Sequence, residues 1–181
     1  MGATLLTVRK ARPSDAEAVA RIYVHAWRDT YPLILPTKLL LGMTIEGQSA
    51  RWRNAIAMAA REVVYVAENE KRAILGMTSL GRARDSELGY DAEIYTLYVD
   101  PLMTGRGIGR ALLGGAFGAL AERGHARCVI WAHAKNPARY FYEAMGGKLI
   151  AERTTTMMGV IVPEIAFGWP KLALAEASRS S

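Results

Sequence analysis

The stretch Tyr95–Leu113 reads YTLYVDPLMTGRGIGRALL and joins a strand pattern to a helix pattern through a glycine loop. Its β-branched and aromatic residues predict a strand over 93–99, which Pro101 ends. An apolar helical pattern follows three alternating glycines, at positions 105, 107 and 109. Glycines let the backbone approach a ligand closely, and the amides at a helix start favour an anion. The stretch therefore predicts a phosphate-binding loop, with a plain glycine-rich turn as the alternative.

Two common phosphate-binding motifs do not fit this loop. A P-loop ends in Gly-Lys-Ser/Thr, whereas this loop ends in Gly-Ile-Gly-Arg. A dinucleotide-binding fingerprint needs the spacing Gly-x-Gly-x-x-Gly and an acidic residue about 20 positions further on. Here the spacing is Gly-x-Gly-x-Gly, and the next expected strand, 126–132, contains no acid. Neither motif therefore describes the loop.

The loop resembles the acyl-CoA signature of the GNAT N-acetyltransferase family, Gln/Arg-x-x-Gly-x-Gly/Ala after a strand that ends Val-x-Pro. Gly107 and Gly109 occupy the glycine positions, and Thr104 stands where the family has Gln or Arg. A second stretch, Asn136–Gly146, reads NPARYFYEAMG and follows the family's Asn-x-x-Ala/Arg-x-x-Phe-Tyr-Glu-x-x-Gly. The two motifs occur in the family's order with a strand between them. The resemblance extends over about 7–169.

Hydrophobic patterning predicts the element order β-α-α-β-β-β-α-β-α-β-β. Ser14 is expected to cap the first helix, with Glu17 completing a capping box. Expected strands cover 5–11, 62–68, 73–80, 93–99, 126–132, 148–157 and 159–169, and one or two helices are expected within 37–61. This order matches the GNAT fold, an α/β mixed sheet flanked by helices. In that fold the fourth and fifth strands splay apart to admit the pantetheine arm of the cofactor.

Length and composition set the broad class of the protein. With 181 residues, 51% hydrophobic and 22% charged, the chain suits one globular domain, expected over 1–170, with a frayed tail at 171–181. Cys128 lies in an apolar strand pattern and is expected to be a buried structural thiol. No apolar stretch approaches about 18 residues, and Met1–Leu6 is too short for a signal peptide. We therefore expect a cytoplasmic protein without membrane segments.

The net charge of +6 fits an acidic ligand such as CoA, nucleic acid, or simple solubility. No basic run of five or more residues appears, so a nucleic-acid-binding arm is not expected. His25, His125 and His133 show no metal-ligand spacing, and we predict no metal site.

By resemblance, the family's donor substrate acetyl-CoA is held by backbone and side chains from three segments. The central strand would hydrogen-bond the pantetheine arm as an added strand does. The glycine loop would hold the diphosphate, and the start of the second motif would add contacts. The residues expected to bind the cofactor are Leu97, Tyr98, Val99, Thr104, Gly105, Arg106, Gly107, Ile108, Gly109, Arg110, Asn136 and Arg139. Asn136 is also the expected cap of the short helix that Pro137 opens.

Tyr142 is the expected general acid. In the family, the tyrosine of this Phe-Tyr-Glu stretch points its hydroxyl at the CoA sulfur. Helical spacing separates Tyr142 from Phe141 by about 100°, so Tyr142 can face a cleft while Phe141 packs inward. A phenol with a pKa of about 10 can protonate a thiolate whose thiol has a pKa of about 8.5, only slightly uphill. The alternative is a core tyrosine whose hydroxyl is already hydrogen-bonded.

Glu93 is the expected general base, because it stands as far before the glycine loop as the catalytic glutamate of the histone-acetylating branch. Strand alternation predicts one face for Glu93, Tyr95, Leu97 and Val99. A carboxylate with a pKa of about 4.3 is a poor base for an ammonium of about 10.4, so desolvation or a bridging water would be needed. A water chain or a solvated strand-end carboxylate is the alternative, and Asp91 is a second candidate.

The acceptor amine is not named by the sequence. By resemblance, the aromatic residues expected to line its pocket are Trp27, Tyr31, Tyr65 and Tyr95, although such residues are more often core. The resemblance also suggests a homodimer formed through the C-terminal strands.

Three functions fit the resemblance. The first is an N-acetyltransferase that moves an acetyl group from acetyl-CoA directly to a primary amine of a small molecule, peptide or protein. The second is a toxin-like acetylase of charged tRNA, against which stand the scattered basic residues and the acids Asp85, Glu87 and Asp91. The third is a non-catalytic acyl-CoA sensor, against which stand Tyr142 and Asn136.

Overall fold

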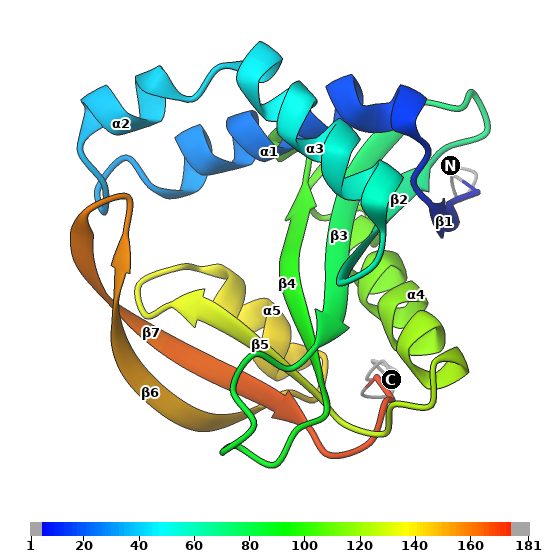
Figure 1. The fold of residues 1–181 in the computed structure, drawn as a ribbon, viewed down its shortest axis with the longest axis vertical. Helices are drawn as coiled ribbons and strands as arrows, with labels where there is room; N and C mark the ends of the chain where they lie inside the picture. Colours follow the sequence, from blue (N-terminus) through cyan, green and yellow to red (C-terminus); the bar gives the residue numbers. More distant parts are fainter. Residues whose placement is uncertain (1–4, 175–181) are drawn as a thin grey trace, which may run out of the picture.

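The computed structural model describes residues 5–174 and contains a sheet of seven strands in the order β1-β2-β3-β4-β5-β7-β6 (Figure 1). The strands are β1 Thr7–Lys10, β2 Glu62–Glu68, β3 Ile74–Arg82, β4 Ala92–Val99, β5 Cys128–His133, β6 Lys148–Met157 and β7 Val160–Trp169. The helices are α1 Ala16–Thr30, α2 Thr37–Gly42, α3 Ile45–Met58, α4 Ile108–Glu122 and α5 Ala138–Ala144, with short 3-10 turns η1 Pro13–Asp15 and η2 Pro101–Met103. Within the described sheet, β4 and β5 run parallel and the other neighbours run antiparallel. The expected mixed α/β sheet is confirmed.

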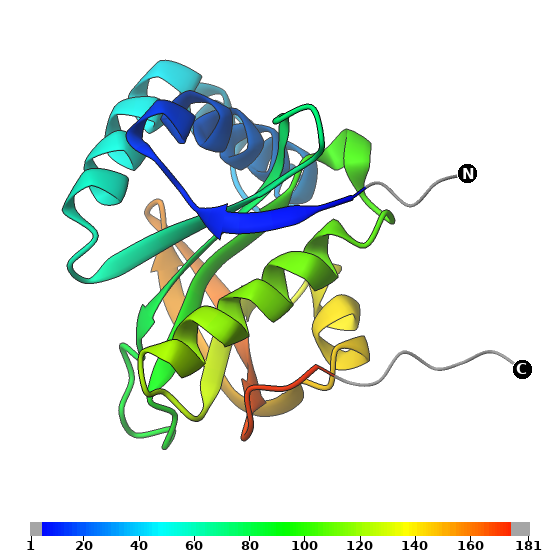
Figure 2. The ribbon, with the colours of Figure 1, turned by 90° about the vertical axis from the view of Figure 1, so that its right-hand side faces the viewer.

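Helices cover both faces of the sheet (Figures 1 and 2). On one face, α1 and α3 bury an aromatic and aliphatic cluster against Val66 and Met77. On the other face, α4 packs against Leu80 and Ile94, and α5 packs Tyr142 against the β7 side of the sheet. Burial of these apolar faces supplies the main driving force for the fold.

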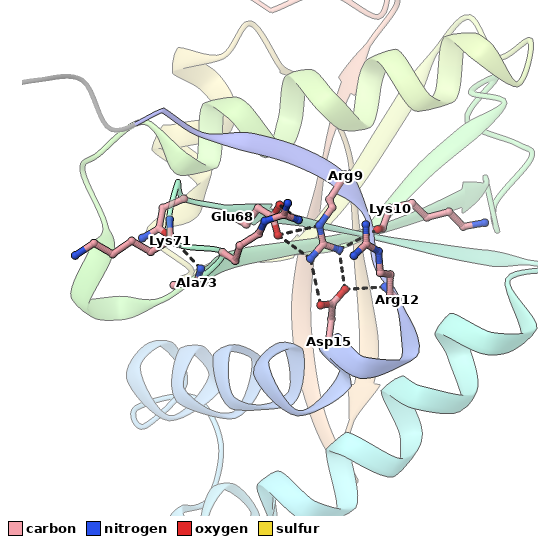
Figure 3. Close-up of polar contacts among 9 residues, drawn as sticks. Arg9, Lys10, Arg12, Asp15, Glu68, Lys71 and Ala73 are labelled. Carbon is pink, nitrogen blue, oxygen red and sulfur yellow. Dashed lines mark hydrogen bonds and ion pairs between the residues drawn. The ribbon is translucent and has the colours of Figure 1, made fainter.

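The start of α1 differs from the prediction. Ser14 does not cap the helix; the 3-10 turn η1 precedes α1, and the carboxylate of Asp15 accepts a hydrogen bond from the Arg12 amide at 2.7 Å. Asp15 also pairs with the guanidinium of Arg9 at 2.7 Å, and Arg9 donates to Glu68 at 2.9 Å (Figure 3). The expectation is wrong because Asp15, next to Ser14, pairs with Arg9 of β1, and helix-capping rules do not consider a residue of another element. This network joins β1, β2 and the start of α1.

A β-bulge interrupts the central strand at Tyr95. Ser79 of β3 pairs with Thr96, and the next residue, Leu80, pairs with Ile94, so Tyr95 is an extra residue in β4. After the bulge the alternation of faces is reversed. Leu97 and Val99 pack toward α4, on the same face as Ile94. The expectation that Glu93 shares a face with Leu97 and Val99 is therefore wrong.

The strands β4 and β5 separate along their length. They pair at three positions only, the last of which joins Ile94 to Ile130. Beyond this pair β4 continues to Val99 with β3 as its partner, and β5 continues to His133 with β7 as its partner. The expected splay of the fourth and fifth strands is confirmed, and it leaves one side of β4 from Tyr95 onward without strand pairing.

Three further expectations concern parts of the chain away from the splay. Cys128 is fully buried, as predicted, and burial raises the pKa of its thiol. Of the predicted tail, 171–181, the residues from 175 onward lie outside the described part of the chain. Between residues 5 and 174, no helix has both the length and the apolar character needed to cross a lipid bilayer.

Candidate active site

A cavity of about 670 Å³ opens where β4 and β5 separate. Its walls come from 95–99 of β4, 130–132 of β5, most of the loop and helix start 101–110, the end of α1, and α5 with the residues on either side of it. Segments that are far apart in the chain thus meet around one space, and most of the predicted site residues line it.

The glycine loop forms one end of the cavity. Gly105 and Gly107 have φ values of +74° and +78°, a left-handed conformation that side chains rarely adopt. A Cβ added at either glycine would meet no atom within 4 Å, so the backbone there faces open space. α4 begins at Ile108 directly after this loop, and its first-turn amides have no partner within the helix. The loop and helix start therefore present several N–H donors, and the positive end of the helix dipole, to the cavity.

Other predicted loop residues differ in their exposure to the cavity. Arg110 lines it, and its guanidinium contacts the Met145 sulfur at 3.4 Å. Thr104 also lines it, and its hydroxyl donates to the Pro101 carbonyl at 3.3 Å. Arg106 is exposed and is not part of the lining. One arginine rather than two is therefore directed at this end of the cavity.

Tyr142 is the buried residue of α5, with 4% of its surface exposed. Its ring packs against Phe141, Phe167 and Trp169, and the residue lines the cavity. Its hydroxyl has no hydrogen-bond partner within 5–174, and the oxygen is accessible rather than sealed inside the protein. The oxygen therefore reaches the cavity. This geometry does not fit the alternative of a core tyrosine with a satisfied hydroxyl.

Burial affects the protonation of Tyr142. Removal from water raises the pKa of its phenol, and the nearby hydroxyl of Tyr31 raises it further. Tyr142 consequently holds its proton at neutral pH and can act as a hydrogen donor.

Tyr31 and Asn136 form a contact between α1 and the start of α5. The Asn136 side-chain amide donates to the Tyr31 hydroxyl at 3.5 Å, and the Asn136 carbonyl oxygen accepts from the Ala138 amide at 2.9 Å. Asn136 thus makes the expected capping bond, although α5 begins at Ala138, and Pro137, expected as its first residue, directly precedes it. Asn136 and Tyr31 both line the cavity. Tyr98 lies beside them, and burial holds the pKa of its phenol well above the usual value. Three tyrosine hydroxyls, including that of Tyr142, thus surround one part of the cavity.

The structure does not bring Glu93 into the cavity. Its side chain is 1% exposed and is absent from the cavity lining. The carboxylate accepts hydrogen bonds from the Arg84 backbone amide at 2.9 Å and from Arg84 Nε at 3.0 Å, and the Arg84 Nη2 adds a further contact. Asp91, the second candidate base, caps the start of β5 instead, through the amides of Ala126 and Arg127. The placement of both acids argues against direct contact with a bound amine.

The predicted acceptor-site aromatics divide into two groups. Tyr31 and Tyr95 line the cavity, and the Tyr95 hydroxyl donates to the Arg82 carbonyl at 2.6 Å. Trp27 does not line it, because its ring lies in the core against Tyr23 and Tyr31. Tyr65 is also absent from the lining.

Arg139, predicted to bind the cofactor, does not line the cavity either. It ion-pairs with Glu143 one helical turn further along, at 3.7 Å. The pair is a local one between residues four positions apart on a partly buried helix face.

Sequence reasoning missed several lining residues, of which Asp29 and Trp131 are the most informative. Asp29 lies in the last turn of α1, and Trp131 lies in β5, with Arg153 stacked at 3.8 Å from its ring centroid. No motif marks either residue. Their only sequence signals are the apolar strand around Trp131 and the position of Asp29 two residues before Tyr31.

Comparisons with known proteins agree with this arrangement. A family model described as acetyltransferase (GNAT) domain matches residues 60–146, which include β4, the glycine loop and α5. The Bacillus subtilis protein named "Uncharacterized N-acetyltransferase YuaI" is 31% identical over 169 residues, which cover 93% of this chain and 95% of that protein.

Two solved structures share the fold. The PaiA N-acetyltransferase from Thermoplasma acidophilum, solved in complex with coenzyme A, gives a TM-score of 0.67 at 19% identity, over 89% of this chain and 98% of that chain. YncA from Salmonella typhimurium, solved with its cofactor acetyl-CoA, gives a TM-score of 0.68 at 21% identity, over 98% of this chain and 100% of that chain. Because it is 31% identical to the Bacillus protein over nearly the whole of both chains, and because it has the matched domain and the splayed central strands, the chain belongs to the GNAT family of N-acetyltransferases.

Proposed function

We propose that the protein transfers the acetyl group of acetyl-CoA directly to a primary amine, with both substrates bound in the cavity between β4 and β5. The observation that carries the proposal is the separation of these strands after Ile94 and Ile130, which joins the glycine loop to Tyr142 through one continuous space. The solved Thermoplasma and Salmonella relatives, which contain coenzyme A and acetyl-CoA, support the choice of donor.

The donor fits two features of the chain. The amides of the glycine loop and the first turn of α4, with Arg110 beside them, suit a diphosphate. Beyond Ile94, the side of β4 that faces β5 has backbone N–H and C=O groups without a strand partner. Leu97, Tyr98 and Val99 can therefore pair with the amides of a pantetheine arm, as a sheet edge pairs with an added strand.

Tyr142 is the proposed general acid. In the reaction a C–N bond forms, the C–S bond breaks, and the Tyr142 phenol gives its proton to the departing sulfur. Burial keeps Tyr142 protonated before this step, and its hydroxyl has no competing partner within the described residues. A thiolate formed among the mainly apolar residues that line the cavity is also poorly solvated, which favours its protonation.

The acceptor ammonium must lose a proton before it attacks. We assign this step to water at the open side of the cavity, because Glu93 lies outside the lining and Arg84 binds its carboxylate. Glu93 then serves to fix the loop 83–91 to the central strand, next to Tyr95.

The test is a thiol-release assay with acetyl-CoA across a panel of amines, amino acids and peptides, run beside calorimetric titration with CoA. Thiol release that depends on a primary amine is the expected result, and mass spectrometry should show the acetylated product. CoA binding without transfer to any member of the panel would instead indicate a sensor. Failure to bind CoA would contradict the proposal as a whole.

A further inference from the structure

Two side chains of opposite charge line the cavity. Among its described lining residues, Arg110 and Asp29 are the side chains with a formal charge at neutral pH. Arg110 lies in the first turn of α4, whereas Asp29 lies in the last turn of α1. The two helices also present opposite ends of their dipoles to the cavity, because Thr30 and Tyr31 at the end of α1 belong to the same lining. The cavity therefore offers a positive group, which favours an anion, and a negative group, which favours a cation.

Asp29 is not neutralised by the protein. It has no hydrogen bond or ion pair with any side chain or amide in the part of the chain that the structure describes. The adjacent Arg28 is directed elsewhere, since its guanidinium donates to the carbonyl oxygens of Leu40 at 3.3 Å and Met43 at 2.9 Å.

Other acids of this protein contrast with Asp29. Asp15 and Glu68 pair with Arg9, Glu93 pairs with Arg84, and Glu164 pairs with Arg153. Asp29 thus supplies an uncompensated carboxylate at the cavity, next to the carbonyl end of α1.

We propose that Asp29 selects acceptors with a second positive charge, separate from the nitrogen that receives the acetyl group. This inference rests on the proposed function, because it concerns the acceptor that would bind in the same cavity. The reacting nitrogen must be neutral when it attacks, so it gains little from a carboxylate. A second ammonium group gains Coulomb energy from Asp29 and from the α1 carbonyl end, whereas an acceptor with a carboxylate is repelled. The preferred substrate class is therefore diamines and other cation-bearing amines.

A matched ligand series tests the role of Asp29. The monoacetylated forms of butylamine, putrescine and γ-aminobutyrate, named below by their parent amines, carry the same four-carbon chain and an uncharged amide nitrogen, with a neutral, cationic or anionic far end. Their affinities for the CoA-saturated protein are measured by calorimetry at low ionic strength. We expect putrescine to bind about fivefold more tightly than butylamine, the range of a partly exposed ion pair, and γ-aminobutyrate to bind most weakly. Equal affinities for putrescine and butylamine in the wild-type protein would overturn the proposal.

Variants separate Asp29 from the general charge of the molecule. Asp29→Asn should make putrescine and butylamine equivalent, and Asp29→Lys should make γ-aminobutyrate the preferred ligand. Glu122→Gln is the matched control, because it also removes one exposed acid from the last turn of a helix but lies outside the cavity lining. It should leave the order of affinities unchanged. An Asp29→Asn protein that keeps the preference for putrescine would also refute the role of Asp29.

The binding series and the thiol-release assay can fail independently. Acetyl transfer to amines without any preference for a second charge would refute the role of Asp29 and leave the proposed reaction intact. Charge-selective binding without transfer would support Asp29 as a cation site and contradict the proposed reaction.

Discussion

The buried carboxylate of Glu93 accepts hydrogen bonds from both the backbone amide and the guanidinium of Arg84, and so fastens the loop 83–91 to the central strand. The same guanidinium lies 4.8 Å from the centroid of the Tyr95 ring, which lines the cavity. Glu93, which occupies the position expected of a catalytic base, therefore has a structural role.

We expect Glu93→Gln to reduce stability more than turnover. The amide retains the shape of the side chain but loses the charge-assisted hydrogen bonds, which are worth about 1.5–3 kcal/mol each. Thermal unfolding should therefore begin at a lower temperature, while kcat/KM for acetyl transfer stays within about threefold of wild type. A variant of unchanged stability whose kcat falls by about a hundredfold or more would instead identify Glu93 as the base.

Tyr142→Phe should lower kcat by about a hundredfold, because the departing sulfur loses its proton donor. The affinity for acetyl-CoA should hardly change, since the ring and its packing against Phe167 and Trp169 remain. Single-turnover rates and calorimetry measure the two quantities separately. Equal turnover in both proteins would remove Tyr142 from the mechanism.

The pH dependence of kcat offers an independent check on Tyr142. A general acid must be protonated, so its contribution is lost as the pH rises through its pKa in the folded protein. Because burial raises the pKa of Tyr142, the wild-type kcat should not fall on the alkaline side before about pH 10, the ordinary value for a phenol. An alkaline limb centred near pH 8 would show that another group limits the rate.

Gly107→Asp should abolish CoA binding. The new side chain would enter the open space beside the first turn of α4 and place a negative charge where the diphosphate is expected. Gly124→Asp is the matched control, because Gly124 also has a positive φ, of +82°, and open space at its Cβ, but follows the opposite end of α4. Both variants should lose about 1–2 kcal/mol to backbone strain, and only the first should lose CoA affinity in calorimetry. Unaltered affinity in Gly107→Asp would contradict the loop assignment.

Asp15→Asn should lower the free energy of unfolding at neutral pH and make that free energy less dependent on pH in the acid range. Burial opposes ionisation of Asp15, but hydrogen bonds from Arg9 and the Arg12 amide hold the pKa of its carboxyl below the usual value (Figure 3). A lowered native pKa contributes stability above the unfolded value of about 3.9, and this contribution disappears as the pH falls through the native pKa. Denaturant midpoints of wild type and variant should therefore differ most near pH 7 and converge toward pH 3. A constant difference across this range would contradict the ion-pair assignment.

The sequence by itself determined the local features of this protein. Positive φ at Gly105 and Gly107 follows from residue type, as does the cap that Asn136 provides to α5, because both depend on atoms a few positions apart. Strand and helix periodicity gave the element order for the same reason, and with the two motifs it was enough to predict a mixed sheet with splayed central strands.

Only the tertiary structure decided which side chains face the cavity. The bulge at Tyr95 reverses the faces of β4, and it is defined by the register of β4 against β3. Arg84 binds the carboxylate of Glu93 outside the cavity. Asp15 pairs with Arg9, and Ser14 does not cap α1. Tyr31 contacts Asn136, which lies 105 positions further along the chain. Long-range contacts of this kind depend on how the elements pack in three dimensions. Periodicity and motif spacing describe only neighbours along the chain, so they could not reveal the free carboxylate of Asp29 at the cavity.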